Sequence, residues 1–260
     1  MLAGWTRRNV GIGFSTTETD FGTTARKPTT NMIKRIINHI AQWIGIKRRM
    51  FIDPKETTKK SVSISYAITV CNEAEPLKRL LDFLQPYLQE GDEIVVQADM
   101  KNVTQEVKEA VQTYTSVISR YVEHDLNFDF AQAKNHLNEQ CQGEWIFQLD
   151  ADECPQEWLM ERLRAIIAAN EAVELYKIPR LNLFSTGDKI EEGHVAWPDY
   201  QGRLYRNIPE RIHWQRPLHE KIRGHKAYLY LPKEERYAIR HLKVREQDNA
   251  KWQVWKEHYA

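Results

Sequence analysis

The feature that most constrains the fold is a regular alternation of β-rich runs and amphipathic stretches between residues 61 and 169. The β-rich runs predict strands at 63–70, 93–98, 117–122 and 145–149. Apolar residues at helical spacing predict helices at 76–88, 103–114, 130–140 and 156–169. This alternation indicates an α/β fold with a mostly parallel, Rossmann-like sheet, flanked by helices and joined by right-handed crossovers. Beyond residue 174 the sequence changes to aromatic, strand-like segments separated by glycine and proline.

Three acidic residues are crowded at the end of the fourth predicted strand. Residues 143–155 read GEWIFQLDADECP, so an apolar run is followed by Asp150, Asp152 and Glu153. Ligands of open α/β sheets bind at the carboxyl ends of the strands, and carboxylates this close repel one another. We therefore expect a positive group beside them. Such oxygen ligands suit Mg²⁺ or Mn²⁺, which also take phosphate oxygens.

An Asp-x-Asp pair often occurs by chance, so other sites built from the same residues have to be considered. An EF-hand loop beginning at Asp150 is excluded, because Pro155 occupies the position that needs a glycine. A phosphohydrolase that uses the first aspartate as its nucleophile remains open. A structural cluster also remains open, in which Asp152 or Glu153 caps the helix after Pro155.

Composition limits the remaining classes of function. The formal net charge is +1, which argues against a general nucleic-acid-binding protein. Three cysteines, Cys71, Cys141 and Cys154, lie far apart and form no CxxC pair, which favours a reducing, cytoplasmic compartment. No apolar stretch reaches 18 residues and no signal-peptide pattern is present, so we expect no membrane-spanning segment.

The two ends of the chain differ from its centre. Residues 1–31 are polar and threonine-rich, which predicts a disordered tail, and Met32 is a candidate natural start. Residues 32–60 predict a basic amphipathic helix and a linker, because isoleucines recur at helical spacing and residues 32–49 carry five lysines or arginines and no acid. Such a helix either lies in an anionic membrane interface or packs on the following domain. Residues 246–260 are expected to form a helical tail.

Five motifs in this order resemble family-2 glycosyltransferases of the GT-A fold. SISYAITVCNEAEPLKRLLDFL and FDFAQAKNHLNEQCQGEWIFQLDADE are similar to the nucleotide-binding half of that family. WPDYQGRLYRN, RPLHEKI and IRHLK resemble the second half of the bacterial subgroup that includes lipopolysaccharide core glucosyltransferases. The resemblance implies a GT-A domain at 61–245, with a nucleotide-sugar-binding half at 61–155 and an acceptor-side half at 156–245.

The resemblance also implies an activity. It is the metal-dependent, inverting transfer of a sugar from a nucleoside diphosphate sugar to a glycan or lipid-linked acceptor, in cell-surface polysaccharide or lipopolysaccharide synthesis. The enzyme would work in the cytoplasm or at the inner face of the membrane. Mn²⁺ or Mg²⁺ bound by Asp152 would stabilise the leaving diphosphate, with Asp150 at the ribose or in the metal's water shell. A non-catalytic sugar-nucleotide or glycan-binding protein with this fold remains an alternative.

The donor-side residues that the resemblance implies lie near strand ends. Asn72 and Glu73 follow the first strand, where the family reads the nucleobase. Many relatives carry an acidic turn after the second strand, whereas this chain reads VVQADMKN, so Gln97 or Asp99 takes that place. The donor nucleotide is therefore left open.

Basic residues form a second group implied by the resemblance. Lys134 and Asn135 match a basic–Asn pair near the nucleotide, with an exposed helix residue as the alternative for each. Arg203 and Arg206 in GRLYR would neutralise the diphosphate or pair with surface acids.

An inverting transfer needs a base that takes the proton from the acceptor hydroxyl. Glu220 in RPLHEKI is the first candidate and Asp199 in WPDY the second. His219 and His241 compete for a third metal-ligand position, which GT-A enzymes often fill with a late histidine. A buried structural role explains either histidine equally well.

Overall fold

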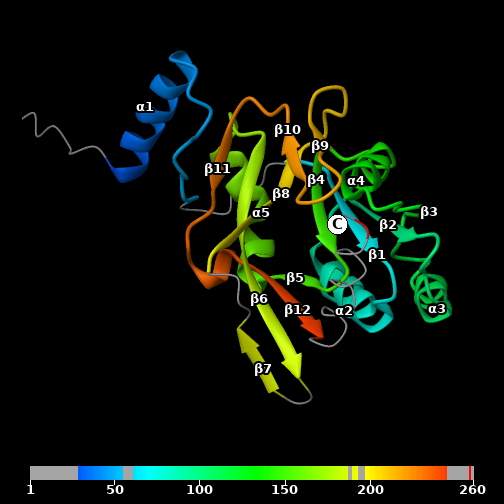
Figure 1. Ribbon diagram of the computed structural model, residues 1–260. Coiled ribbons are helices and arrows are strands. Elements are labelled where there is room, and N and C mark those ends of the chain that lie inside the picture. The colour runs from blue at the N-terminus through cyan, green and yellow to red at the C-terminus, as the bar shows by residue number, and fades with distance from the viewer. Residues whose placement is uncertain (1–28, 55–60, 187–188, 193–196, 245–257, 259–260) are drawn as a thin grey trace, which may run out of the picture.

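The computed structural model describes residues 29–54, 61–186, 189–192, 197–244 and 258. Its centre is a ten-stranded sheet with the order β3-β2-β1-β4-β8-β6-β12-β5, in which β7 and β11 also pair with β6 (Figure 1). A separate ribbon is formed by β9 and β10. The α-helices are α1 (Thr30–Trp43), α2 (Ala74–Leu84), α3 (Gln105–Thr113), α4 (Phe130–Glu139) and α5 (Glu157–Ala169). The strands are β1 (Ile64–Val70), β2 (Glu93–Asp99), β3 (Arg120–His124), β4 (Trp145–Asp150), β5 (Glu153–Pro155), β6 (Leu175–Thr186), β7 (Lys189–Glu192), β8 (Asp199–Arg206), β9 (His213–Gln215), β10 (Lys221–Arg223), β11 (Tyr228–Tyr230) and β12 (Ile239–Val244).

The first half of the sheet consists of parallel strands with buried apolar side chains. β1 lies between β2 and β4 and runs parallel to both. One face, which includes the fully buried Tyr66 and Phe147, packs against α2, α3 and α5, and the other face packs against α4 and the β9–β10 ribbon. Parallel strands end at the same edge of a sheet, and the register accordingly places Gln97, Thr69 and Asp150 side by side.

The second half is mixed and continues the same sheet. β8 is antiparallel to both β4 and β6 and so joins the two halves. β12 runs parallel to β6 and antiparallel to β5, which places His241 opposite Glu153. The three-residue strand β5 was not predicted, because it is too short to show a period and depends on its pairing with β12.

The predicted α/β architecture is confirmed, and all four predicted strands and four predicted helices of residues 61–169 are present. The third strand begins at Arg120 rather than at residue 117. The reason is local: the backbone N–H groups of Val117 and Ile118 both donate to the Tyr114 carbonyl at 2.9 Å, so these residues form a turn after α3.

The N-terminal segment departs from its predicted boundaries. α1 begins at Thr30 rather than residue 32, because the Thr29 hydroxyl accepts a hydrogen bond from the Met32 amide at 3.3 Å and caps the helix. The start of the predicted linker packs on the domain, where Ile52 is buried and exchanges two 3.0 Å hydrogen bonds with the Asn170 side chain. Of the tail predicted at 1–31, residues 1–28 lie outside the described residues, whereas Thr30 and Asn31 belong to α1. Of the tail predicted at 246–260, only His258 is described.

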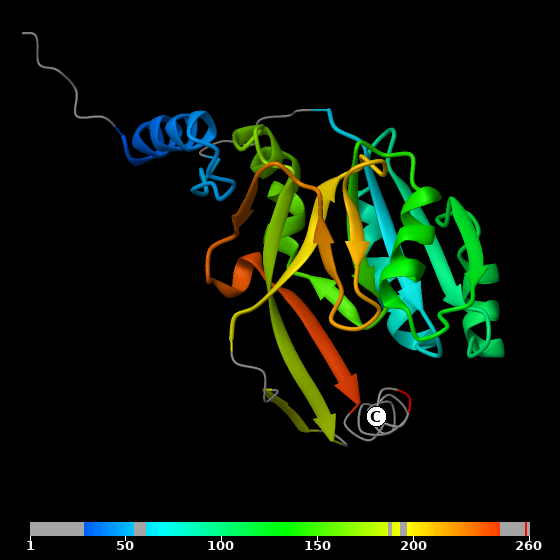
Figure 2. The same cartoon turned by 45° about the horizontal axis from the view of Figure 1, so that its top comes forward.

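α1 stands beside the sheet near β11 (Figures 1 and 2). Its asparagine side chains contact the segment that follows the helix. The Asn31 amide donates to the Asp53 carbonyl at 2.8 Å, and the Asn38 side chain exchanges two hydrogen bonds with the Met50 backbone. The predicted stripe of Ile33, Ile36, Ile37, Ile40 and Ile44 stays between 41% and 56% exposed. The interpretation in which this stripe packs on the domain is therefore wrong. Every helix in the described ranges is too short or too polar to cross a bilayer.

Candidate active site

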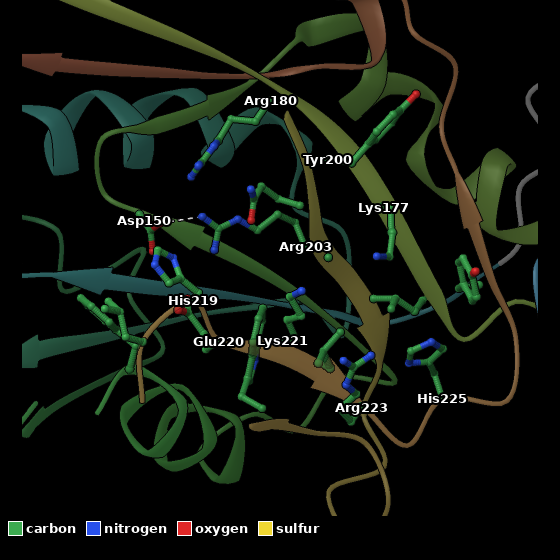
Figure 3. Close-up of a pocket in the computed structure, with 18 of the residues that line it drawn as sticks. Asp150, Lys177, Arg180, Tyr200, Arg203, His219, Glu220, Lys221, Arg223 and His225 are labelled. Carbon is green, nitrogen blue, oxygen red and sulfur yellow. Dashed lines mark hydrogen bonds and ion pairs between the residues drawn. The ribbon is translucent and has the colours of Figure 1, made fainter. Parts of the chain in front are cut away.

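Two adjoining pockets open where the parallel strands end. The strand-end pocket is a cavity of about 360 Å³ lined by residues such as Thr69, Gln97, Asp99 and Asp152. The basic pocket, of about 670 Å³, lies between β6, β8 and β10 (Figure 3). The two pockets share Phe130, Asp150, Arg180, Glu220 and Lys243. Ligands bound in the two pockets would therefore meet at these residues.

Two arginines supply the positive charge that was expected beside the strand-end acids. Arg203 on β8 donates to Asp150 at 2.6 Å and to Glu153 at 2.5 Å. Arg180 on β6 donates to Glu153 at 3.1 Å and to Asp199 at 2.7 Å. Glu153 and Arg203 are only 1% and 3% exposed, so this network is buried. The chain itself therefore neutralises much of the acidic cluster.

Asp150 is held as an ionised hydrogen-bond acceptor. Burial alone would raise its pKa, but the charges of Arg203 and Lys134 hold the pKa of Asp150 well below its usual range. One carboxylate oxygen accepts from the Thr69 hydroxyl at 2.8 Å and the other from Arg203. Because both oxygens have donors, Asp150 is poorly placed as the nucleophile that a phosphohydrolase of this type would need.

Asp152 faces a different partner. The Nε2 atom of His241 lies 3.3 Å from the Asp152 carboxylate, and its Nδ1 atom lies 3.0 Å from the Asn182 side-chain oxygen. Asp152 and His241 both line the strand-end pocket, whereas the exposed His219 lines the basic pocket. Of the two candidate histidines, the structure thus brings His241 to the Asp-x-Asp motif.

The Asp152–His241 pair fits a divalent cation as a partial set of ligands. Carboxylate oxygens suit Mg²⁺ and Mn²⁺, and neutral imidazole is a common metal ligand. A proton on Nδ1 bound to Asn182 leaves Nε2 free to act as the ligand. Among the described residues, no three His, Cys, Asp or Glu side chains cluster closely enough to hold a metal. The ion would therefore need further ligands from a substrate diphosphate and water, as Mg²⁺ sites often do.

Glu220 lies at the boundary between the two pockets. Its carboxylate is 2.5 Å from the ammonium group of Lys134, which lies 4.7 Å from the centre of the Trp214 ring. Burial would raise the pKa of Glu220, but the charge and hydrogen bond of Lys134 lower it below its ordinary value. Glu220 is therefore ionised at neutral pH and able to accept a proton. Lys134 is buried, so the alternative of an exposed helix residue is wrong for it, and its ion-pair partner is Glu220.

Three of the four residues predicted to read the nucleobase and ribose line the strand-end pocket. They are Glu73, Gln97 and Asp99. Gln97 is buried and its amide is bound to the α4 backbone at 2.9 Å, whereas Asp99 accepts hydrogen bonds from the loop that follows β2. Asn72 is exposed and lines neither pocket, so its predicted role is not supported by its position.

Asn135 and Asp199 also line neither pocket, and both are held in hydrogen bonds with the surrounding chain. The Asn135 side chain exchanges two hydrogen bonds, of 2.9 and 2.7 Å, with the Trp214 backbone and so fixes β9 against α4. Asp199 accepts from the side chains of Arg180, Asn182 and Gln201. Arg180 lowers the pKa of Asp199 against the effect of burial, so this carboxylate positions Arg180 and is poorly suited to remove a proton.

Arg180 lines both pockets and belongs to the charge network, yet the sequence analysis did not single it out. It lies in the strand-like run KIPRLN, which matches no motif. A cation within a strand has to be paired with an acid when it is buried, and this was the one sequence signal that could have identified Arg180. Arg206, by contrast, lies at the surface, where its closest carboxylate contact is Glu144 at 3.4 Å. Only Arg203 of the two predicted arginines reaches the acidic cluster.

The chain is similar to known proteins in both sequence and fold. Residues 65–228 match the family described as Glycosyl transferase family 2. No curated protein matches the chain. The solved structure of S. aureus TarS 1-349 in complex with UDP-GlcNAc is 15% identical with a TM-score of 0.50, and the match covers 71% of this chain and 59% of that one. The mannosyltransferase PcManGT from Pyrobaculum calidifontis, in complex with GDP-Man and Mn²⁺, is 16% identical with a TM-score of 0.42, covering 58% of this chain and 44% of that one.

The chain thus spans between 44% and 59% of the length of these two solved structures. At this identity the likeness to TarS shows the fold alone. The family match covers residues 65–228 of 260, more than half of the chain, and includes the strands of both pockets as far as the start of β11. It confirms the predicted family, while the lipopolysaccharide core subgroup stays a prediction. The chain belongs to glycosyl transferase family 2.

Proposed function

We propose that this protein is a metal-dependent, inverting glycosyltransferase that moves a sugar from a nucleoside diphosphate sugar to a glycan or lipid-linked acceptor. The observation that carries the proposal is the meeting of two pockets at Asp150 and Glu220. A transfer between two substrates needs a site for each and a boundary where the reacting atoms are held together. A role in cell-surface polysaccharide or lipopolysaccharide synthesis is proposed from the motifs WPDYQGRLYRN and RPLHEKI alone.

The donor is assigned to the strand-end pocket. Glu73, Gln97 and Asp99 offer carboxylate and amide groups for a nucleobase and ribose. The diphosphate would then lie toward Asp152 and His241, which would hold Mn²⁺ or Mg²⁺. When bound, such a cation neutralises charge on the leaving diphosphate. TarS, which has the same fold, was solved with UDP-GlcNAc, a ligand of the class proposed here.

The acceptor is assigned to the basic pocket, with Glu220 as the base. Glu220 takes the proton from the acceptor hydroxyl while that oxygen forms its bond to the anomeric carbon. The bond from the anomeric carbon to the diphosphate breaks, and the diphosphate leaves with the bonding electrons. Attack on the face opposite the leaving group inverts the anomeric centre. Lys134 holds the carboxylate at the pocket boundary and keeps it ionised until then.

Thermal shifts with a panel of nucleoside diphosphates and their sugars, with and without Mn²⁺, test the donor assignment. We expect one nucleoside diphosphate to raise the Tm by roughly 5–10 °C in Mn²⁺ at about 100 times its Kd, because a ligand that binds only the folded state stabilises it. The matching nucleoside should shift the Tm much less, since it lacks the diphosphate. If no diphosphate or nucleotide sugar shifts the Tm with either cation, the proposal is wrong.

We further propose that α1 docks on an anionic membrane surface. Its isoleucine stripe faces solvent, and its polar side is already occupied by hydrogen bonds from Asn31 and Asn38. Residues 30–50 contain no acid, and Lys34, Arg35, Lys47 and Arg48 are at least partly exposed, although Arg49 is buried. This positive charge complements anionic lipid rather than an uncharged apolar partner. Each basic residue near such a surface contributes about 1 kcal/mol, and each buried isoleucine about 1.5–3 kcal/mol.

The segment after α1 links this surface to the basic pocket. The Arg49 amide donates to the Tyr228 carbonyl at 2.8 Å, and the Tyr228 amide donates to the Lys47 carbonyl at 2.9 Å. Arg48 also lies 5.0 Å from the centre of the Tyr230 ring. Tyr228 lines the basic pocket, so a docked α1 would hold that pocket close to the lipid surface. This placement supports a lipid-linked acceptor.

Co-sedimentation with vesicles that contain or lack phosphatidylglycerol tests the docking surface. The double variant Ile36→Glu/Ile40→Glu should weaken binding to anionic vesicles by at least about 100-fold, because two inserted apolar side chains are lost. The matched variant His39→Glu/Gln42→Glu adds the same number of acids on exposed positions outside the stripe and should weaken binding less. Absence of wild-type binding at low salt contradicts the proposal. A dimer in light scattering that only Ile36→Glu/Ile40→Glu disrupts would identify a second copy as the occupant instead.

A further inference from the structure

The basic pocket carries more positive charge than its own acids balance. Two carboxylates line it, and each already has a cationic partner: Asp150 is bound by Arg203, and Glu220 by Lys134. Six lysines and arginines line the same pocket: Lys177, Arg180, Arg203, Lys221, Arg223 and Lys243. Across the described part of the chain, no carboxylate forms an ion pair with Lys177, Lys221 or Arg223. These three cations therefore leave the pocket with positive charge that no carboxylate balances.

Their positions follow from the strands that carry them. Lys221 and Arg223 alternate with the buried Ile222 along β10, so both point to the same side of the ribbon. Lys177 comes from β6, and its ammonium lies 5.7 and 5.3 Å from the ring centres of Tyr228 and Tyr230, which restrain it. Figure 3 shows Lys177, Arg223 and His225 on the side of the pocket away from Asp150, with Lys221 between Glu220 and Arg223.

The Nδ1 atom of His225 at this end is buried and has no hydrogen-bond partner in the described residues. The residue as a whole is 9% exposed. Burial lowers the pKa of His225 to about 4, and the charges of Lys47, Lys177 and Arg223 act in the same direction, while Glu174 opposes them. A buried polar atom without a hydrogen-bond partner is costly, so a ligand that supplies one is favoured at this position. In the Nδ1–H tautomer, this atom can donate to an oxygen of an anionic ligand.

We infer that the acceptor carries a phosphate or carboxylate group, which binds in the basic pocket between Lys177, Arg223 and His225. The anion site itself does not depend on the proposed glycosyl transfer, but the identification of its ligand as the acceptor does. The anion would lie at the end of the pocket opposite Asp150 and Glu220, which leaves the boundary free for the hydroxyl that reacts. It would also compensate the three unpaired cations, and the pocket would then select a charged acceptor over a neutral sugar.

Equilibrium binding of glucose 6-phosphate, glucuronate and glucose, measured without metal by ligand-observed NMR, tests this inference. We expect both anions to bind more tightly than glucose and to weaken as salt is added. Lys177→Met/Arg223→Gln should weaken binding of the anions by roughly tenfold or more, because two charged hydrogen-bond donors are lost.

The control Lys226→Met/Arg236→Gln removes the same charge from exposed positions outside the pocket and should bind the anions as wild type does. Melting curves of both variants show whether the fold is kept.

Three results would overturn the inference. They are equal binding of glucose and the anions, unchanged anion binding in Lys177→Met/Arg223→Gln, and displacement of the anions by UDP or GDP without metal, which would place them in the donor site. Failure of the proposed function gives a different pattern. In that case no nucleoside diphosphate stabilises the wild-type protein with Mn²⁺, yet the anions still bind in a manner that depends on Lys177 and Arg223.

Discussion

Glu220→Gln is expected to lower turnover by roughly 10²–10⁴-fold while the affinity for the donor stays within about threefold of wild type. Glutamine keeps the size and hydrogen-bonding reach of glutamate but cannot accept a proton. Glu220 lies where the two pockets meet, so the loss should fall on the chemical step rather than on donor binding. Glu210→Gln, at an exposed position, is the matched control and should keep normal turnover.

The ion pair with Lys134 allows a second test, the pH dependence of the rate, which would not change if Glu220 had only a structural role. Lys134 lowers the pKa of Glu220 against the effect of burial, so Lys134→Met should raise that pKa. A base is active only when deprotonated, and the acid limb of the pH–rate profile should therefore shift to higher pH. A glutamate with a purely structural role predicts a lower Tm in Glu220→Gln with only a modest loss of rate. Near-normal turnover of a well-folded Glu220→Gln would move the base elsewhere, with His219 as the next candidate.

The sequence was sufficient to predict the first half of the sheet, because each of its strands and helices shows a local period. Tyr66 and Phe147 belong to apolar runs long enough to identify, and parallel strands necessarily bring Thr69, Gln97 and Asp150 to one edge. The short strands after residue 174 were harder to place. β5 and β12 pair only because the chain folds back, and the His241–Asp152 contact depends on that pairing.

The charge network of the site could not be read from the sequence, since its partners are distant along the chain. Arg203 and Asp150 are 53 positions apart, and Arg180 and Glu153 are 27 apart. The crowded acids correctly predicted a positive partner, but not that two arginines would supply it. The motif resemblance likewise suggested Asp199 and Asn135, whereas the structure shows that their hydrogen bonds position Arg180 and β9.

The helix α1 shows a related limit. Its period predicted an isoleucine stripe, and periodicity alone favours burial of that stripe on the domain. Only the three-dimensional contacts of Asn31 and Asn38 show that the polar side is the one that packs. A sequence pattern identifies an apolar face, and the structure decides what that face contacts.

The central claim is that the strand-end pocket binds a nucleoside diphosphate through a cation held by Asp152 and His241. Calorimetric titration of the stabilising nucleoside diphosphate with Mn²⁺ tests it most directly, in wild type, Asp152→Asn and the exposed control Asp53→Asn. Asparagine matches aspartate in size, and Asp152 lies in the turn between β4 and β5, so the fold should be kept. The account predicts that Asp152→Asn weakens Mn²⁺-dependent binding by roughly 10–100-fold, the effect of losing one contact to a charged group, while Asp53→Asn binds as wild type does. Unchanged Mn²⁺-dependent binding in a folded Asp152→Asn protein would contradict it.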